Sequence, residues 1–112
     1  MEYLVELYTP KPAWLVLPET ERSAFLEGVQ EGMGVLFAGG GIDLIGMGET
    51  VADVEHGSGH QYFALWRFAS ATARERLLEG IAASGWYEYF DHVNTVGRAG
   101  EIAAHFDQLR NV

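Results

Sequence analysis

Apolar and polar side chains alternate along four stretches of the chain, which is the period of a β-strand with one buried face. In between, apolar side chains recur every three or four positions, which is the period of an amphipathic helix. The pattern predicts strands at residues 3–9, 42–50 and 61–68 and from about residue 90, and helices at 18–38 and 71–84. Ile102, Phe106 and Leu109 predict a short terminal helix.

Turn and capping residues mark the ends of these elements. Pro10 and Pro12 cannot donate to a sheet ladder and end the first strand. The run Gly39–Gly41 ends the first helix, Ser70 is a good N-cap for the second, and Gly85 suits its C-terminal end. Residues 86–89 are expected to form an irregular aromatic turn before the fourth strand.

Glycines inside predicted elements need a separate explanation. Gly28, Gly32 and Gly34 each cost a helix about 1 kcal/mol relative to alanine. They indicate either close packing against another backbone, which we favour, or a weak helix end. Gly46 and Gly48 in the second strand indicate a bulge or a close approach.

The order of elements predicts the fold class. Strand, helix, strand, strand, helix, strand is the βαββαβ order of a ferredoxin-like α+β domain, here one domain over residues 1–112 with a C-terminal helix. Both long helices then lie on one face of the sheet. The other face needs a cover, and a second copy is expected to supply it in a homodimer.

Alternation along the strands assigns side chains to the two faces. Small aliphatic residues suit packing against helices, whereas amphipathic and polar residues suit a cavity. We therefore expect a mixed aromatic and polar set on the open face, away from the helices: Glu6, Tyr8, Tyr62, Trp66, His92 and Asn94.

Composition limits the classes of partner and cofactor that this protein is expected to bind. Sixteen acidic and seven basic residues give a formal charge of −9, which disfavours nucleic acid and anionic membrane surfaces as partners. No basic leader and no apolar run long enough for a membrane span are present, so a cytoplasmic protein is expected. The chain has no cysteine, and it lacks phosphate-binding and dinucleotide motifs, so no cofactor is predicted.

Two stretches carry a family resemblance. TPKPAWLVLPETERSAFLEG after the first strand, and WRFASATARERL followed by WYEYFDHV, resemble the darcynin-like proteins. These belong to the dimeric α+β barrel superfamily, which includes antibiotic biosynthesis monooxygenases, haem-degrading enzymes, polyketide cyclases, isomerases and stress-related proteins. The resemblance spans about residues 3 to 97. It implies a dimer that binds a small organic molecule, with Trp66 at the position of a pocket tryptophan in some monooxygenase-like members.

The same resemblance has one departure. Haem-degrading members carry an asparagine on the first strand as partner of that tryptophan, whereas Glu6 or Tyr8 occupies this region here. The departure argues against haem degradation.

Two residues are candidates for catalysis. His92 has a side chain suited to proton transfer near neutral pH, although a bond to a backbone carbonyl would explain it equally. Glu6 lies among apolar neighbours and must be paired or hydrated. Its structural alternative is a buried link to Arg67 or Lys11.

Five further residues are candidates for substrate binding: Tyr8, Tyr62, Trp66, Asn94 and, at the mouth of the cavity, His60. The aromatic members would form flat walls for a ring, or would simply pack the core or the dimer. The spacing of His56 and His60 is weak support for metal, because Gly57 and Gly59 disfavour a helix there, and no metal site is predicted.

Two functions remain open from the sequence. One is a cofactor-independent monooxygenase, cyclase or isomerase that acts by oxygenation or proton transfer on a partly aromatic molecule. The other is a non-catalytic ligand-binding or stress-associated dimer. The fold does not discriminate between them.

Overall fold

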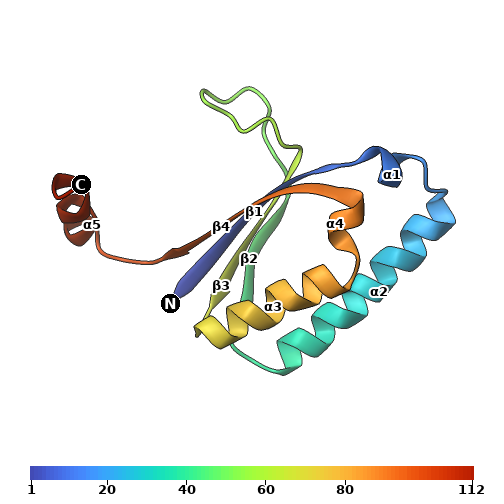
Figure 1. The fold of residues 1–112 in the computed structure, drawn as a ribbon, viewed down its shortest axis with the longest axis horizontal. Coiled ribbons are helices and arrows are strands. Elements are labelled where there is room, and N and C mark those ends of the chain that lie inside the picture. Colours follow the sequence, from blue (N-terminus) through green and yellow to red (C-terminus); the bar gives the residue numbers. More distant parts are fainter.

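A computed structural model describes all of residues 1–112. The elements follow the order β1 (Glu2–Pro10), α1 (Pro12–Leu15), α2 (Glu19–Ala38), β2 (Ile42–Glu49), β3 (Tyr62–Phe68), α3 (Ala71–Ala83), α4 (Trp86–Tyr89), β4 (Phe90–Arg98) and α5 (Ile102–Arg110). The strands form one antiparallel sheet in the order β2-β3-β1-β4, with α2 and α3 on one face (Figure 1). This confirms the predicted ferredoxin-like α+β fold.

Several local predictions are confirmed. The Ser70 hydroxyl accepts a 3.2 Å hydrogen bond from the backbone N–H of Ala73 and caps α3. Gly85 follows that helix in the left-handed region at φ 83°, where a side chain would be strained. The β2–β3 register shifts between Leu44 and Gly46, which is the bulge expected in this strand.

The predicted aromatic turn at residues 86–89 is one helical turn, α4. A second single turn, α1, was not predicted, because its apolar residues follow two prolines without a helical repeat. Trp14 of α1 is buried against Phe25, Tyr89 and Phe90. This contact joins the start of α2 to the region where β4 begins.

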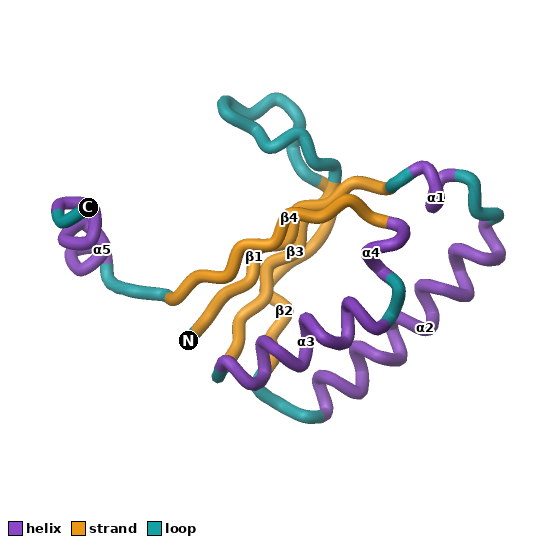
Figure 2. Tube along the Cα trace, viewed as in Figure 1, coloured by secondary structure: helices purple, strands orange, loops and turns teal.

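The core lies between the sheet and α3. Its buried residues are Leu4, Ile42, Ala64, Trp66, Phe68, Ala73 and Leu77. The α2 helix buries no residue completely, and its inner side chains Met33 and Leu36 are only partly buried against this core. Figure 2 shows α2 alongside α3 on the same side of the strands. The loose packing of α2 leaves space between helices and sheet.

The predicted assignment of faces is wrong. Trp66 and Leu4 lie in the core with Ala73 and Leu77 of α3, so their face of the sheet is the one that the helices cover. By alternation Glu6, Tyr8, Tyr62, His92 and Asn94 share this covered face. Side-chain size misled the prediction, because large aromatic rings and aliphatic residues occur on both faces: Trp66 lies in the core with Leu4, whereas Phe63 lies on the open face with Val5.

The prediction of close packing at the α2 glycines is also wrong. A Cβ atom added at Gly28, Gly32 or Gly34 would have no heavy atom outside its own helix within 4 Å. No helix in the structure is both long enough and apolar enough to cross a bilayer.

Candidate functional site

Glu6 lies at the centre of the site, on the strand between β3 and β4. Its register partners are Ala64 on β3 and Asn94 on β4. The residue is only 4% exposed and is the one buried residue of the chain with a charged side chain. Such a carboxyl group needs hydrogen-bond partners or a displaced pKa, because burial disfavours its charged form.

Trp66 supplies the closest partner of Glu6. It lies on β3 opposite Leu4, diagonally across from Glu6, and its indole Nε1 donates a 2.5 Å hydrogen bond to Glu6 Oε1. The bond fixes both the carboxyl group and the plane of the indole ring. Neither of the partners expected as structural alternatives contacts Glu6: Arg67 pairs with Asp43, and Lys11 donates to the carbonyl of Tyr87.

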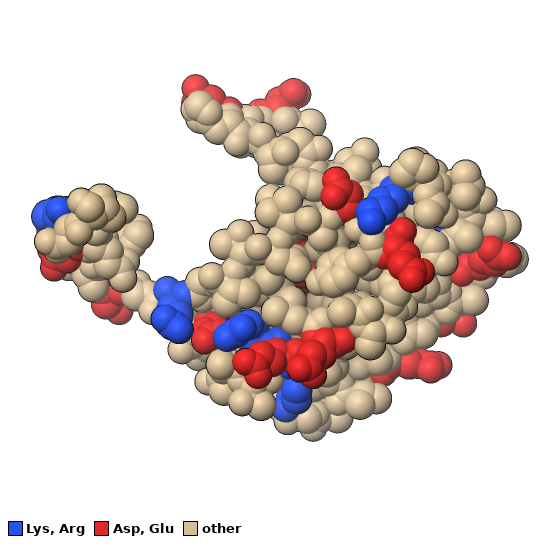
Figure 3. Space-filling model, viewed as in Figure 1, with Lys and Arg blue, Asp and Glu red and all other residues tan.

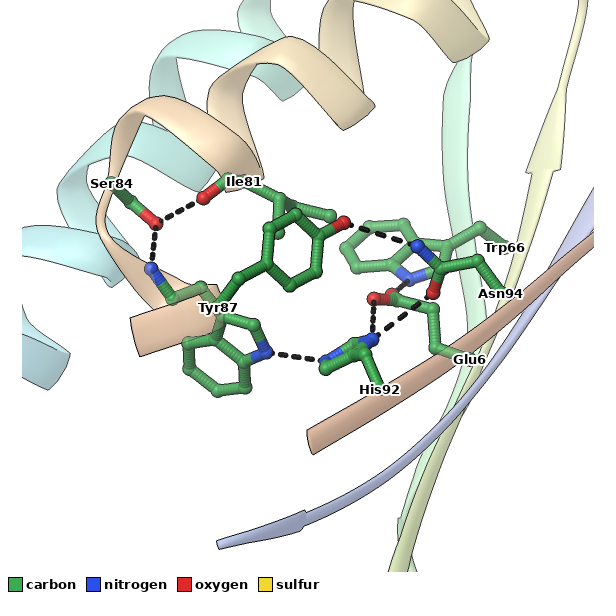
Figure 4. Close-up of polar contacts among 8 residues, drawn as sticks. Glu6, Trp66, Ile81, Ser84, Tyr87, His92 and Asn94 are labelled. Carbon is green, nitrogen blue, oxygen red and sulfur yellow. Dashed lines mark hydrogen bonds and ion pairs between the residues drawn. The ribbon is translucent and has the colours of Figure 1, made fainter. Parts of the chain in front are cut away.

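His92 lies beside the other carboxyl oxygen, and both of its ring nitrogens have partners (Figure 4). Trp86 Nε1 can only donate, so His92 Nε2 accepts its 2.6 Å hydrogen bond and carries no proton. The proton of the neutral ring is therefore on Nδ1, which is 3.0 Å from Asn94 Oδ1 and 3.6 Å from Glu6 Oε2. Asn94 Nδ2 in turn donates to the Tyr87 hydroxyl at 3.1 Å.

The pKa shifts agree with this geometry. Burial raises the pKa of the Glu6 carboxyl above its ordinary 4.5, against the opposing hydrogen bond from Trp66. Burial lowers the pKa of His92 below its ordinary 6.5, against the opposing bond to Asn94. Both directions oppose a charged carboxylate–imidazolium pair at this contact.

A cavity of about 370 Å³ opens beside Glu6, between the sheet and the two long helices. Most of its walls are apolar, and Glu6 is the only residue in them with an ionisable acid or base group other than the Tyr8 phenol. Burial, then the charges of Glu6 and Tyr62, raise the pKa of Tyr8 above its ordinary 10.0, so this phenol is neutral at physiological pH. The lining residues are Glu6, Tyr8, Gly28, Val29, Gly32, Met33, Val35, Leu36, Met47, Ala64, Trp66, Leu77, Gly80, Ile81, Ser84 and Trp86.

The predicted site residues divide into three groups. Glu6, Tyr8 and Trp66 line the cavity, while His92 and Asn94 lie behind Glu6 in its hydrogen-bond network. Tyr62 and His60 lie elsewhere, in a more polar hollow lined mainly by the loop of residues 50–61. Their link to the site is indirect, through the Tyr8 ring 5.8 Å from that of Tyr62 and through the 3.0 Å bond between His60 Nδ1 and Thr9 Oγ1.

Trp86 and the two α2 glycines Gly28 and Gly32 are cavity residues that the sequence did not identify. Trp86 was expected in an aromatic corner, and nothing in the sequence pairs it with His92 six positions later. The helical stripe that holds Val29, Met33 and Leu36 was the available signal for this wall, since Gly28 and Gly32 line the same cavity.

Metal and haem can be tested against these side chains. No group of three or more His, Cys, Asp or Glu side chains is arranged to hold a metal ion. His56 lies in the exposed loop at φ 58°, and His60 is engaged with Thr9. Haem does not fit the cavity either, since no basic side chain lines it for the propionates and His92 Nε2 is occupied by Trp86.

Together the fold and the site define a ferredoxin-like α+β protein with an apolar, ligand-sized cavity and one buried carboxyl group. The chain belongs to the family of unknown function DUF6616, whose sequence model matches residues 1–112. No curated protein matches it in sequence.

Solved structures share the fold. The crystal structure of "Putative Chlorite dismutase TA0507" is similar over 87% of this chain at 14% identity and a TM-score of 0.59, and the chain spans only 42% of that protein. Protein Atu4242 from Agrobacterium tumefaciens is similar over 91% of this chain and 96% of its own, at 20% identity and a TM-score of 0.51. These similarities show the ferredoxin-like α+β fold and do not reach the darcynin-like proteins in particular.

Proposed function

We propose that this protein binds a small, uncharged, partly aromatic organic molecule in the cavity between the sheet and its helices, and that Glu6 exchanges a proton with it. One observation carries the proposal. A cavity of about 370 Å³ with mostly apolar walls contains a single buried carboxyl group, Glu6, whose position the Trp66 indole fixes. Ligand pockets of about 300–1,000 Å³ commonly combine apolar walls with a few placed polar groups.

The charge of the ligand follows from the lining. No lysine or arginine lines the cavity, so a carboxylate or phosphate would lose its hydration without gaining a counter-charge. The same negative ligand would be repelled by an ionised Glu6. A neutral ring instead gains contact with Trp66, Trp86 and Tyr8.

Glu6 is a better candidate than His92 for proton exchange. Burial raises the pKa of Glu6 above its ordinary 4.5, in the direction of neutral pH. A carboxyl group exchanges protons most effectively when its pKa lies near the working pH. His92 presents no free lone pair, because Trp86 occupies Nε2 and Nδ1 carries the proton. We therefore assign His92 a positioning role behind Glu6, and we favour proton transfer over oxygenation.

Three further statements belong to this proposal. The first is that the protein forms a homodimer in which a second copy covers the open sheet face. The second is that it functions in the cytoplasm, and the third is that it is related to the darcynin-like proteins. The apolar open face supports the dimer, and the stretches beginning at Thr9 and Trp66 support the relationship.

A matched pair of probes tests the ligand class. In a thermal-shift assay at neutral pH, 2-naphthol should raise the melting temperature, whereas 2-naphthoate, with the same ring system and a negative charge, should not. A larger shift with 2-naphthoate than with 2-naphthol, or no shift with any neutral ring, would contradict the proposal.

A further inference from the structure

The terminal helix α5 lacks a partner within its own chain. Its residues Ile102, Phe106 and Leu109 form one stripe and are 70%, 47% and 55% exposed. The side-chain hydrogen bonds of the helix stay within residues 105–111. Isolated helices shorter than about 12–15 residues are marginal in water, so a nine-residue helix needs tertiary contacts to persist.

The open face of the sheet is a second apolar surface without a cover. At its centre are Val5, Leu7, Phe63, Leu65 and Val93, with Val5 still 40% and Val93 48% exposed. On β2 the positions opposite Leu65 and Phe63 are glycines, Gly46 and Gly48, and the remaining register position of this face is Asp43, opposite Arg67. The two charged side chains at the β2 edge of this face, Arg67 and Asp43, form an ion pair at 3.1 Å. Because each charge has a partner, the ion pair does not prevent burial of the face.

Both surfaces lie on the same side of the molecule. Figure 1 shows α5 and the loop of residues 50–61 rising at opposite ends of the sheet, on the side away from α2 and α3. In Figure 3 the outline between these two projections carries few charged atoms, whereas acidic residues gather over the helices. The open face therefore lies between these two projections.

The size of these surfaces identifies the occupant. The α5 helix is about 13 Å long, so it cannot cover strands of about 25–30 Å by folding back over its own sheet. The sheet of a second copy has the same size and can cover these strands. The sheet face offers roughly 500 Å² in projection, and a stable interface buries about 800 Å² per partner. The stripe on α5 supplies part of the remainder.

We propose that α5 is a reciprocal arm of the homodimer. A two-fold axis packs the open faces on each other, and each copy then places the Ile102, Phe106 and Leu109 stripe of its α5 on the other copy. Both unpartnered surfaces are buried at once by a single symmetric contact. The arm rests on the homodimer of the proposed function and adds the element that completes its interface.

Sedimentation equilibrium of the full chain and two α5 variants tests the arm. Phe106→Glu and Gln108→Glu add the same charge to the same helix, but only Phe106 belongs to the apolar stripe. Wild type and Gln108→Glu should form dimers, whereas Phe106→Glu should raise the dimer dissociation constant at least tenfold. Circular dichroism of each variant should confirm an intact sheet.

A third variant, Val93→Glu on the open face, separates the arm from the dimer. Dissociation by Val93→Glu together with an unchanged Phe106→Glu dimer would overturn the arm and leave the homodimer standing. A wild-type chain that stays monomeric at all concentrations would overturn both. Neither result bears on the cavity ligand, which the thermal-shift assay tests in the monomer as well.

Discussion

The indole Nε1 of Trp66 donates a 2.5 Å hydrogen bond to Oε1 of Glu6, from the neighbouring strand and within the covered face of the sheet. Trp66 is 3% exposed and Glu6 is 4% exposed, so water does not compete for this bond. A bond to a buried, partly charged acceptor is worth more than one at the surface, and losing its donor leaves the acceptor unsatisfied.

Trp66→Phe should therefore destabilise the protein by about 1–3 kcal/mol at neutral pH, beyond the cost of the smaller ring. A double-mutant cycle with Glu6→Leu, which removes the acceptor of this bond, isolates the contribution of the pair when measured by urea unfolding. The coupling energy should be positive and of the same order. Additive effects of the two substitutions would show that the hydrogen bond contributes nothing to stability.

The raised pKa of Glu6 predicts a pH dependence of stability. The folded chain holds the Glu6 proton to a higher pH than the unfolded chain, so this residue makes the free energy of unfolding fall as pH rises above about 4.5. Glu6→Gln should remove that decrease. Glu49→Gln, at an exposed position of β2, is the control for the lost charge. Parallel stability curves for wild type and Glu6→Gln between about pH 4 and 8 would contradict the shift.

The bond from Trp86 to His92 predicts one tautomer. Wild-type His92 should carry its proton on Nδ1 across neutral pH, which long-range ¹H–¹⁵N correlation spectra detect directly. Trp86→Phe should free Nε2 and raise the pKa of His92, whereas Trp14→Phe, in the same aromatic region but away from His92, should leave it unchanged. A proton found on Nε2 of the wild-type ring would refute the assignment.

Proton exchange by Glu6 is testable on a neutral bicyclic ketone. In D₂O, wild type should accelerate exchange of the acidic C–H protons of 2-tetralone, followed by ¹H NMR, because a positioned base contributes about 10²–10⁴-fold. Glu6→Gln should lose most of this acceleration, and Glu49→Gln should retain it. If wild type exchanges these protons no faster than buffer alone, proton transfer by Glu6 is contradicted and only the binding of a ligand remains.

Several features that depend on residues close together in the sequence were predicted correctly, whereas several that depend on distant residues were not. Local rules identified the Ser70 cap, the Gly85 turn and the Gly46 bulge, because each needs only a few neighbouring residues. The alternation rule also placed Glu6, Trp66 and His92 on one face. Which face the helices cover was mispredicted, since the answer depends on how closely α2 approaches the sheet.

The polar network was beyond sequence reasoning for a related reason. The donor that fixes the His92 tautomer is Trp86, six positions earlier in the chain, and α4 has to form before the two rings meet. Likewise Gly28 and Gly32 have the appearance of close-packing glycines, and only the position of α2 shows that they border a cavity.

Three glycines on α2 provide the most direct test of the cavity as a ligand site. Gly28 and Gly32 line it, whereas Gly34 does not, and a Cβ atom added at any of the three would have no heavy atom outside its own helix within 4 Å. Leucine at any of them should stabilise the helix by about 0.8 kcal/mol, so loss of binding would not reflect unfolding. Gly32→Leu and Gly34→Leu therefore form a matched pair.

The decisive measurement is isothermal titration calorimetry of 2-naphthol with wild type, Gly32→Leu and Gly34→Leu. We predict saturable binding, one molecule per chain, to wild type and to Gly34→Leu, and at least tenfold weaker binding to Gly32→Leu. Equal affinity in all three proteins, or no binding to wild type, would contradict a ligand site between the helices and the sheet.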